Sequence, residues 1–213
     1  NNNVVSVSNP FIATITANSE FVANFEAEEN QSGELHNGHE YVDLGLPSGL
    51  KWATCNVGAT APEEYGNNYA WGETTPQSWL ATEYTYNDNP EVLPLSADAA
   101  NVNWGGNWRM PTKAEQEELM DTDNCTWTWT TQNGVSGYKV TSNKNGNSIF
   151  LPAAGFRYGT LLGDVGIEGC YCSSILYKDI TTHNACNLNF DRDSPIVNWI
   201  LRTNGQSIRP VSD

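Results

Sequence analysis

Five cysteines are the residues of this sequence with the widest chemical potential, since a thiol can form a disulfide, bind a metal or act as a nucleophile. They are Cys55, Cys125, Cys170, Cys172 and Cys186. Their odd number leaves at least one unpaired, and their spacings form no regular disulfide framework. The C-x-C spacing of Cys170 and Cys172 differs from the C-x-x-C of zinc and thioredoxin-like redox sites. We therefore interpret the five as small, partly buried thiols and expect neither a metal nor a redox centre.

Histidines and short catalytic motifs give no stronger signal. His36, His39 and His183 have no further residues at zinc-ligand spacing. The sequence contains no glycine-rich phosphate loop after a strand, no G-x-S-x-G, no H-E-x-x-H and no D-x-D-x-D-G calcium loop. It therefore predicts a protein that is not an enzyme and carries no cofactor.

The charge of the chain limits its partners. The 213 residues include 25 acidic and 10 basic ones, for a formal net charge of -15. Such a surface repels nucleic-acid phosphates and anionic lipid, and no run reaches the roughly 20 apolar residues of a membrane span. We expect no nucleic-acid binding and no membrane insertion by this segment, and any targeting signal is expected upstream of Asn1.

Two segments of different character follow one another along the chain. Residues 4–25 alternate apolar and polar side chains in short strand-like runs, so we interpret residues 1–30 as appended strands or the remnant of a β repeat. The acidic, aperiodic stretch 26–38 is typical of a linker. The main domain is expected at residues 39–213.

Short strands, one clear helix and long loops are predicted within this domain. Residues 41–53 indicate a hairpin with a Pro-Ser-Gly turn at 47–49. Thr112 and Glu115 form the capping box of a helix that should end near residues 121–123, with an apolar face of Ala114, Leu119 and Met120. Residues 62–79 predict a short helix or a packed loop. Abundant glycine (18 residues) and asparagine (26 residues) favour a loop-rich protein.

Further strands are expected at residues 137–141, 148–152, 185–190 and 207–211. In the third of these, Cys186, Leu188 and Phe190 should point inward while Asn187 and Asn189 point outward. The predicted fold class is α+β, with short twisted strands, one or two helices and long loops.

Four blocks in this order carry a family resemblance. They are residues 41–52 (YVDLGLPSGLKW), 65–73 (YGNNYAWGE), 108–119 (WRMPTKAEQEEL) and 205–211 (GQSIRPV). Together they resemble bacterial C-type-lectin-like domains, including the Fibrobacter-type paralogous domain of Bacteroidetes surface proteins and, more distantly, formylglycine-generating enzymes. The resemblance covers residues 39–213 and implies a C-type-lectin-like fold, in its formylglycine-generating-enzyme-like variant, on an extracellular protein of a cell surface or a phage virion. Residues 4–25 separately resemble the closing half of an internalin-type B-repeat.

A finer resemblance concerns the last quarter of the chain. Family members carry Tyr-Trp-Ser-Ser-Ser followed by an Asn- and Tyr-rich run, whereas this chain has Tyr-Cys-Ser-Ser-Ile at 171–175 and then an idiosyncratic mixture. Many departures are single changes from an Asn or Tyr codon. The region resembles the variable region of a diversity-generating retroelement protein, similar in kind to the phage major tropism determinant.

This resemblance implies a ligand-binding face whose exposed positions are rewritten. The implied residues are Cys172, Ile175, Tyr177, Lys178, Asp179, Ile180, Thr182, His183, Cys186, Asp191, Arg192, Asp193, Ile196, Asn198, Trp199, Ile200, Leu201, Arg202 and Thr203.

The distribution of charge agrees with this placement. Residues 170–213 contain four basic and four acidic residues, so residues 1–169 carry the whole net charge of -15. A neutral patch of aliphatic, aromatic and Arg side chains on an acidic body is typical of a contact surface. The expected anchors are Tyr177, Trp199, Arg202 and the cluster Ile196, Ile200 and Leu201. Trp199 could equally belong to the core, as we expect for Trp52, Trp71, Trp104 and Trp108.

The favoured hypothesis is therefore an extracellular protein that binds a protein or glycan ligand, such as a receptor-recognition module or adhesin. One alternative is a structural subunit of a pilus or surface layer. Another is an oxidase related to formylglycine-generating enzymes, in which Cys170, Cys172 or Cys186 would need a lowered thiol pKa.

Overall fold

The computed structural model describes residues 34–78, 83–178 and 183–213. The chain divides into two compact units, residues 1–32 and 33–213. The predicted strands at 4–25 and the resemblance to a B-repeat lie outside the described residues, so the fold given below is that of the second unit.

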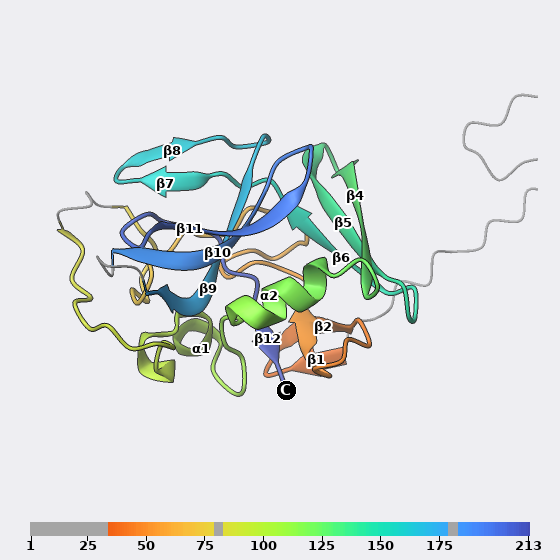
Figure 1. The fold of residues 1–213 in the computed structure, drawn as a ribbon, viewed down its shortest axis with the longest axis horizontal. Coiled ribbons are helices and arrows are strands. Elements are labelled where there is room, and N and C mark those ends of the chain that lie inside the picture. The colour runs from red at the N-terminus through yellow and green to blue at the C-terminus, as the bar shows by residue number, and fades with distance from the viewer. Residues whose placement is uncertain (1–33, 79–82, 179–182) are drawn as a thin grey trace, which may run out of the picture. The chain divides into compact units, whose positions relative to one another are not determined.

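A four-stranded sheet joins the start and the end of this unit. It contains β1 (Glu34–His36), β2 (His39–Asp43), β3 (Lys51–Ala53) and β12 (Val211–Ser212), in the order β1-β2-β3-β12. Figure 1 labels β1, β2 and β12 of this sheet. The predicted hairpin at 41–53 is confirmed by the antiparallel pairing of β2 with β3. The predicted closing strand at 207–211 is much shorter than expected, since only residues 211 and 212 form it.

The linker prediction fails at its C-terminal end. Residues 34–36 form β1, which pairs with β2 across a turn at Asn37 and Gly38. Both turn residues have positive φ, 46° and 82°, as a two-residue hairpin with the sequence Asn-Gly requires. The folded domain therefore includes residues that the acidic composition assigned to a linker.

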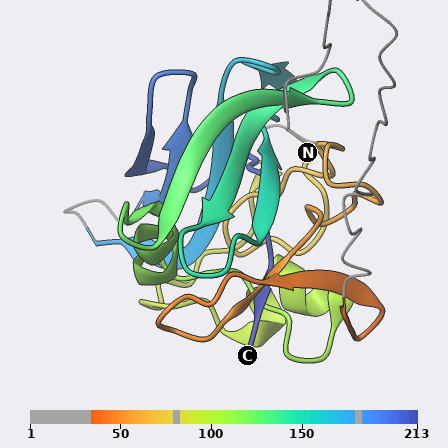
Figure 2. The same cartoon turned by 90° about the vertical axis from the view of Figure 1, so that its right-hand side faces the viewer.

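Two three-stranded antiparallel sheets form the centre of the unit. One contains β4 (Cys125–Gln132), β5 (Val135–Ser142) and β6 (Ser148–Pro152), whose strands lie side by side in Figure 2. The other has the order β11-β10-β9, with β9 (Gly169–Tyr177), β10 (Asn184–Phe190) and β11 (Pro195–Leu201). A separate hairpin consists of β7 (Phe156–Tyr158) and β8 (Leu161–Gly163).

Two short α-helices complete the described architecture. The helix α1 (Ala99–Trp104) begins after Asp98, whose side chain accepts a hydrogen bond from Asn101 N, and a 3-10 turn at Leu95–Ala97 precedes it. The sequence did not predict this helix; the short helix or loop expected at 62–79 has no helix in its described part, residues 62–78. The mixed α+β class, mostly strands with two helices, is confirmed.

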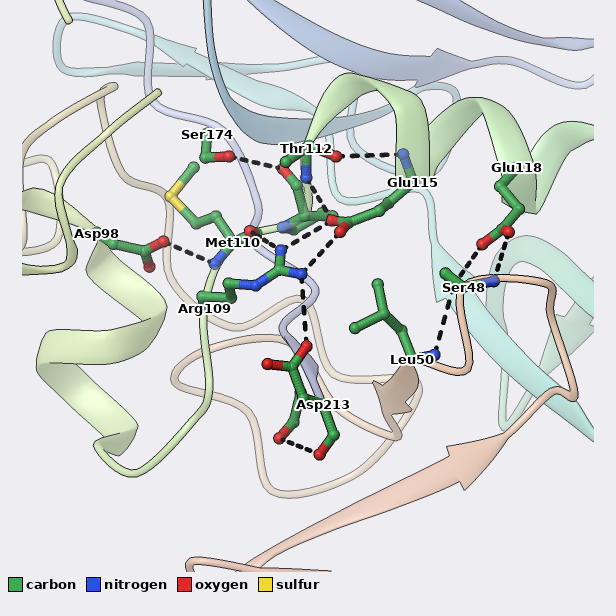
Figure 3. Close-up of polar contacts among 12 residues, drawn as sticks. Ser48, Leu50, Asp98, Arg109, Met110, Thr112, Glu115, Glu118, Ser174 and Asp213 are labelled. Carbon is green, nitrogen blue, oxygen red and sulfur yellow. Dashed lines mark hydrogen bonds and ion pairs between the residues drawn. The ribbon is translucent and has the colours of Figure 1, made fainter. Parts of the chain in front are cut away.

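The helix α2 (Lys113–Met120) begins and ends close to the predicted positions. The predicted capping box is confirmed: Glu115 N donates to Thr112 Oγ1, and Thr112 N donates to Glu115 Oε2 (Figure 3). Arg109 extends this network with two hydrogen bonds to Glu115, 2.8 and 2.7 Å long. The predicted apolar face is partly wrong, because Ala114 is exposed while Gln116 is buried beside Leu119.

Apolar side chains gather in two core clusters, one on each side of the sheet of β9 and β10. The first contains Trp52, Tyr171, Leu188 and Phe190, and the second contains Trp71 with residues of β9 and β10 such as Leu176 and Ala185. The core positions predicted for Trp52, Trp71 and Trp108 are confirmed, whereas Trp104 is only partly buried and stacks on His39. Both faces of β9 and β10 are covered. Of the three strands in this sheet, the edge strand β11 has the most exposed side chains.

Candidate binding face

The register of the C-terminal sheet decides which side chains reach solvent. Each β10 residue from Asn184 to Phe190 pairs with one residue of β11, from Leu201 back to Pro195. Side chains alternate between the two faces along a strand. Leu188 and Phe190 therefore enter one core cluster, and Ala185 enters the other. Asn187 was predicted to point outward but is buried, because its face of β10 is also covered.

The edge strand β11 presents large apolar side chains to solvent. Ile196 is 52% exposed, Trp199 is 49% exposed and Leu201 is 44% exposed. The strand has no charged residue between Pro195 and Leu201. The sequence predicted no strand between residues 190 and 207, whereas the structure has a seven-residue strand there.

An aromatic pair lies at the end of this sheet. The rings of Tyr177 and Trp199 stack with centroids 5.4 Å apart and an interplanar angle of 18°. They come from β9 and β11, on the two sides of β10. Trp199 is 49% exposed, so the alternative that it belongs to the core is wrong. Stacked aromatic side chains at the surface are typical of the anchors that carry binding energy.

A second exposed apolar segment was missed from the sequence. Tyr158, Leu161 and Leu162 of the β7–β8 hairpin and Val165 and Ile167 after it are all exposed. Two backbone hydrogen bonds join Arg157 of this hairpin to Gly205, which follows the end of β11: Arg157 N donates to Gly205 O, and Gly205 N donates to Arg157 O. Eight of the twelve exposed large apolar residues in the described parts of the chain thus belong to residues 158–201. The signal that could have found the hairpin is the pair Leu161-Leu162 between Gly159 and Gly163.

Most of the predicted face is at the surface. The exposed or half-exposed members are Ile175, Tyr177, Lys178, His183, Asp191, Arg192, Asp193, Ile196, Asn198, Trp199, Ile200, Leu201 and Thr203. We call these thirteen residues the C-terminal face. Asp179, Ile180 and Thr182 lie outside the described residues.

Three predicted members of the face are buried and must be removed from it. Cys172 and Cys186 are 1% and 4% exposed because their strands are covered on both faces. Arg202 is 6% exposed. None of the three side chains is placed to contact a ligand at the surface of this structure.

Arg202 holds a neighbouring loop instead. Its guanidinium lies 5.3 Å from the ring centroid of Trp71, 5.2 Å from that of Tyr84 and 5.9 Å from that of Tyr86. It donates hydrogen bonds to the Tyr86 and Asp88 carbonyl oxygens and to Asn89 Oδ1. A backbone hydrogen bond from Trp71 N to Arg202 O adds to these contacts. Arg202 therefore fixes residues 84–89 against the end of β11.

Replacing Arg202 with lysine should destabilise this loop, because an ammonium cannot reproduce a planar fork that stacks on aromatic rings and donates to three acceptors. We expect a loss of about 2 kcal/mol in the free energy of unfolding and faster proteolytic cleavage within residues 83–90. Chemical denaturation and limited proteolysis measure both effects. Arg192→Lys, at an exposed position, is the matched control and should change neither; equal behaviour of the two variants would contradict the role given to Arg202.

The five thiols are free, and four of them are buried. Burial raises the pKa of Cys172 and, with the nearby Glu168 carboxylate, that of Cys170. Burial also raises the pKa of Cys186, although Lys113 acts in the opposite direction, and it raises the pKa of Cys125 to about 11. A thiol needs a lowered pKa to act as a nucleophile at neutral pH. These environments therefore disfavour the thiol oxidase.

The buried thiols should be inert in the native protein. With a thiol-specific chromogenic reagent at mildly alkaline pH, we expect only Cys55, which is partly exposed, to react before unfolding, and all five cysteines to react in denaturant. Burial and the scarcity of thiolate both slow the reaction. Rapid native labelling of Cys172 or Cys186, located by peptide mapping, would contradict this description of the sheet.

Comparisons with known proteins found no matching family model, curated protein or solved structure. No described helix combines the length and apolar character that crossing a membrane requires. Within the described ranges, no three His, Cys, Asp or Glu side chains gather in a way that could hold a metal ion.

Proposed function

We propose that this chain is an extracellular, non-enzymatic binding protein that recognises a protein or glycan ligand through the C-terminal face. The carrying observation is that Ile196, Trp199 and Leu201 are about half exposed on an uncharged edge strand. The rest of the folded unit is acidic, since residues 34–169 contain 17 acidic and six basic residues. Exposed apolar side chains grouped in this way favour association, and Trp and Tyr are the commonest anchors of interfaces.

A C-type-lectin-like scaffold is part of this proposal. The residues that carry the resemblance behave as a framework: Trp71, Trp108 and Arg209 are at most 1% exposed, and the block around Thr112 forms the capped helix α2. Edge strands and loops surround that framework at the surface. In proteins with rigid cores, binding residues are concentrated in such segments.

Diversification by a retroelement is the finer part of the proposal. Among the positions that depart from the family pattern, eight are exposed or half-exposed: Ile175, Lys178, His183, Asp191, Arg192, Ile196, Ile200 and Leu201. Two further departures, Cys172 and Cys186, are buried. Of the positions that keep the family pattern, Ala185, Leu188, Phe190, Gly205 and Arg209 are buried and Trp199 is half exposed. Departures mainly at the surface suit a mechanism that alters contacts without unfolding the scaffold.

Deep sequencing of the locus across its source population tests this part. We expect substitutions at the C-terminal face that trace to adenines of a near-copy template beside a reverse transcriptase. Because Arg202, Cys172 and Cys186 are buried, variants at these three positions should be rarer than at Ile196 or Leu201. An even spread of changes, without a template, would overturn diversification and leave a binding protein of fixed specificity.

A further inference from the structure

In the described parts of the chain, the C-terminal sheet (β11-β10-β9) is covered by other residues along its β9 edge but not along its β11 edge. On the β9 side, Leu93 N donates to Ser174 O and Leu176 N donates to Glu91 O, so residues 91–93 cover that edge. On the β11 side, no strand from the described residues pairs with the outer edge. Backbone N–H and C=O groups of a free edge strand form a template for a further strand.

Proteins usually protect such an edge with charged side chains, bulges or a very short strand. β11 has none of these within its seven residues, and Pro195 stands only at its first position. Ile, Val and Trp make up much of the strand, which are the residue types that favour strand pairing. This edge is therefore open in both its backbone and its side chains.

We propose that β11 pairs antiparallel with β11 of a second copy of this chain, about a two-fold axis at Asn198. Asn198 is the central residue of the strand, so each copy would place it opposite Asn198 of the other. Val197 would then face Trp199 of the second copy, and Ile196 would face Ile200. Cross-strand pairs of β-branched and aromatic residues stabilise antiparallel sheets, and this register provides them on both faces.

Charge favours the same contact. Residues 34–169 contain 17 acidic and six basic residues whereas residues 170–213 are neutral, so two copies of the folded unit approach with the least repulsion through the C-terminal region. At one end of β11 lie Asp191, Arg192 and Asp193, and at the other lie His183 and Lys178, which is paired with Glu91 at 2.8 Å. An antiparallel arrangement places these two ends beside each other, and no charged residues oppose each other within the strands.

Pairing of two copies is a property separate from ligand binding, and it would also raise the apparent affinity for a repetitive ligand. Two three-stranded sheets would join into one sheet of six strands, with the C-terminal faces of the two copies side by side. Two linked ligand sites raise the apparent affinity for a repetitive target without any new contact. The second copy would occupy the backbone edge of β11, which no strand of the described residues covers.

Charge reversal at the two-fold axis tests the proposal. The mass of the full chain, measured by light scattering during size exclusion, should rise with concentration from 23.4 kDa toward twice that value. Asn198→Lys and Asn198→Asp should each remain at the mass of one chain, since like charges directly opposite destabilise a strand pair. An equimolar mixture of the two variants should restore the mass of two chains.

Controls keep the outcome decisive. Asn107→Lys and Asn107→Asp, at another exposed Asn, should form dimers like the wild type, and unchanged melting temperatures should show that all variants are folded. Hydrogen exchange of the wild type provides a second test: the amides of residues 196–201 that point away from β10 should be protected only at high concentration. A wild type that stays at 23.4 kDa at every concentration, or a dimer that tolerates both Asn198 variants, would overturn the proposal. Ligand binding by the wild type, at concentrations where its mass is that of one chain, would stand independently of either result.

Discussion

Replacing Arg209 with methionine is expected to lower the free energy of unfolding by about 4 kcal/mol, most of the stability of a domain at the lower end of the ordinary range of about 5–15 kcal/mol. Arg209 is 1% exposed. Its guanidinium donates to Asn56 Oδ1 at 3.0 Å, to the Ala53 and Thr54 carbonyl oxygens at 3.1 and 2.9 Å, and to Phe150 O at 2.9 Å. Methionine fills much of the aliphatic volume but leaves these buried acceptors without a donor, at about 1–3 kcal/mol for each group.

Equilibrium unfolding in urea measures the effect. Arg192→Met, which removes an exposed arginine from the same part of the chain, is the matched control and should stay within about 0.5 kcal/mol of the wild type. If Arg209→Met is expressed only in an unfolded form, circular dichroism and the control variant together establish that result. A folded Arg209→Met protein with unchanged stability would show that these hydrogen bonds do not hold the closing segment to β3 and β6.

Replacing Gly155 with alanine is the second change of large expected effect, about 3 kcal/mol. Gly155 has a φ of 66°, and a Cβ atom there would meet Gly163 O at 1.9 Å. Left-handed backbone costs an alanine about 1–2 kcal/mol, and a contact with rigid backbone adds a comparable cost of overpacking. Since Gly155 precedes β7, the change should displace the β7–β8 hairpin and its exposed apolar residues.

Gly163→Ala supplies the matched control, because it lies in β8 of the same hairpin and a Cβ there meets nothing within 4 Å. Its free energy of unfolding should remain close to that of the wild type. Thermal unfolding compares the two variants, and hydrogen exchange of residues 156–163 reports whether the hairpin has moved. Equal stabilities of the two variants would contradict the tight packing of Gly155 against the strand end.

Local signals in the sequence predicted local structure well. The helix α2 could be foreseen because its capping box lies within four residues, and the hairpin of β2 and β3 because its turn residues are contiguous. The turn at Asn37 and Gly38 carried an equally local signal, but the acidic composition around it favoured a linker. Composition was there a poorer guide than the turn dipeptide.

Long-range packing could not be foreseen in the same way. β11 has exposed side chains on both faces, so it lacks the alternation that marks a half-buried strand; its pairing with β10 defines it. Arg202 belonged to a residue type that is frequent in interfaces, yet it is buried by Trp71, Tyr84 and Tyr86, which precede it by more than 100 residues. The exposure of each predicted face residue depends on such distant neighbours.

Ligand binding by matched surface variants tests the central claim most directly. The wild-type chain is screened on arrays of glycans and of extracellular proteins, and ligands recovered there are measured in a monovalent format against two triple variants. The face variant carries Ile196→Ser, Trp199→Ser and Leu201→Ser. The control variant carries Leu35→Ser, Leu95→Ser and Val102→Ser, which removes three comparably exposed apolar side chains elsewhere.

We predict that the control variant retains the wild-type affinity and that the face variant loses at least about 30-fold, the equivalent of one anchor residue of roughly 2 kcal/mol. Both variants should keep the melting temperature of the wild type to within a few degrees. Ligands bound equally well by the face variant, or lost only by the control variant, would contradict recognition through the C-terminal face.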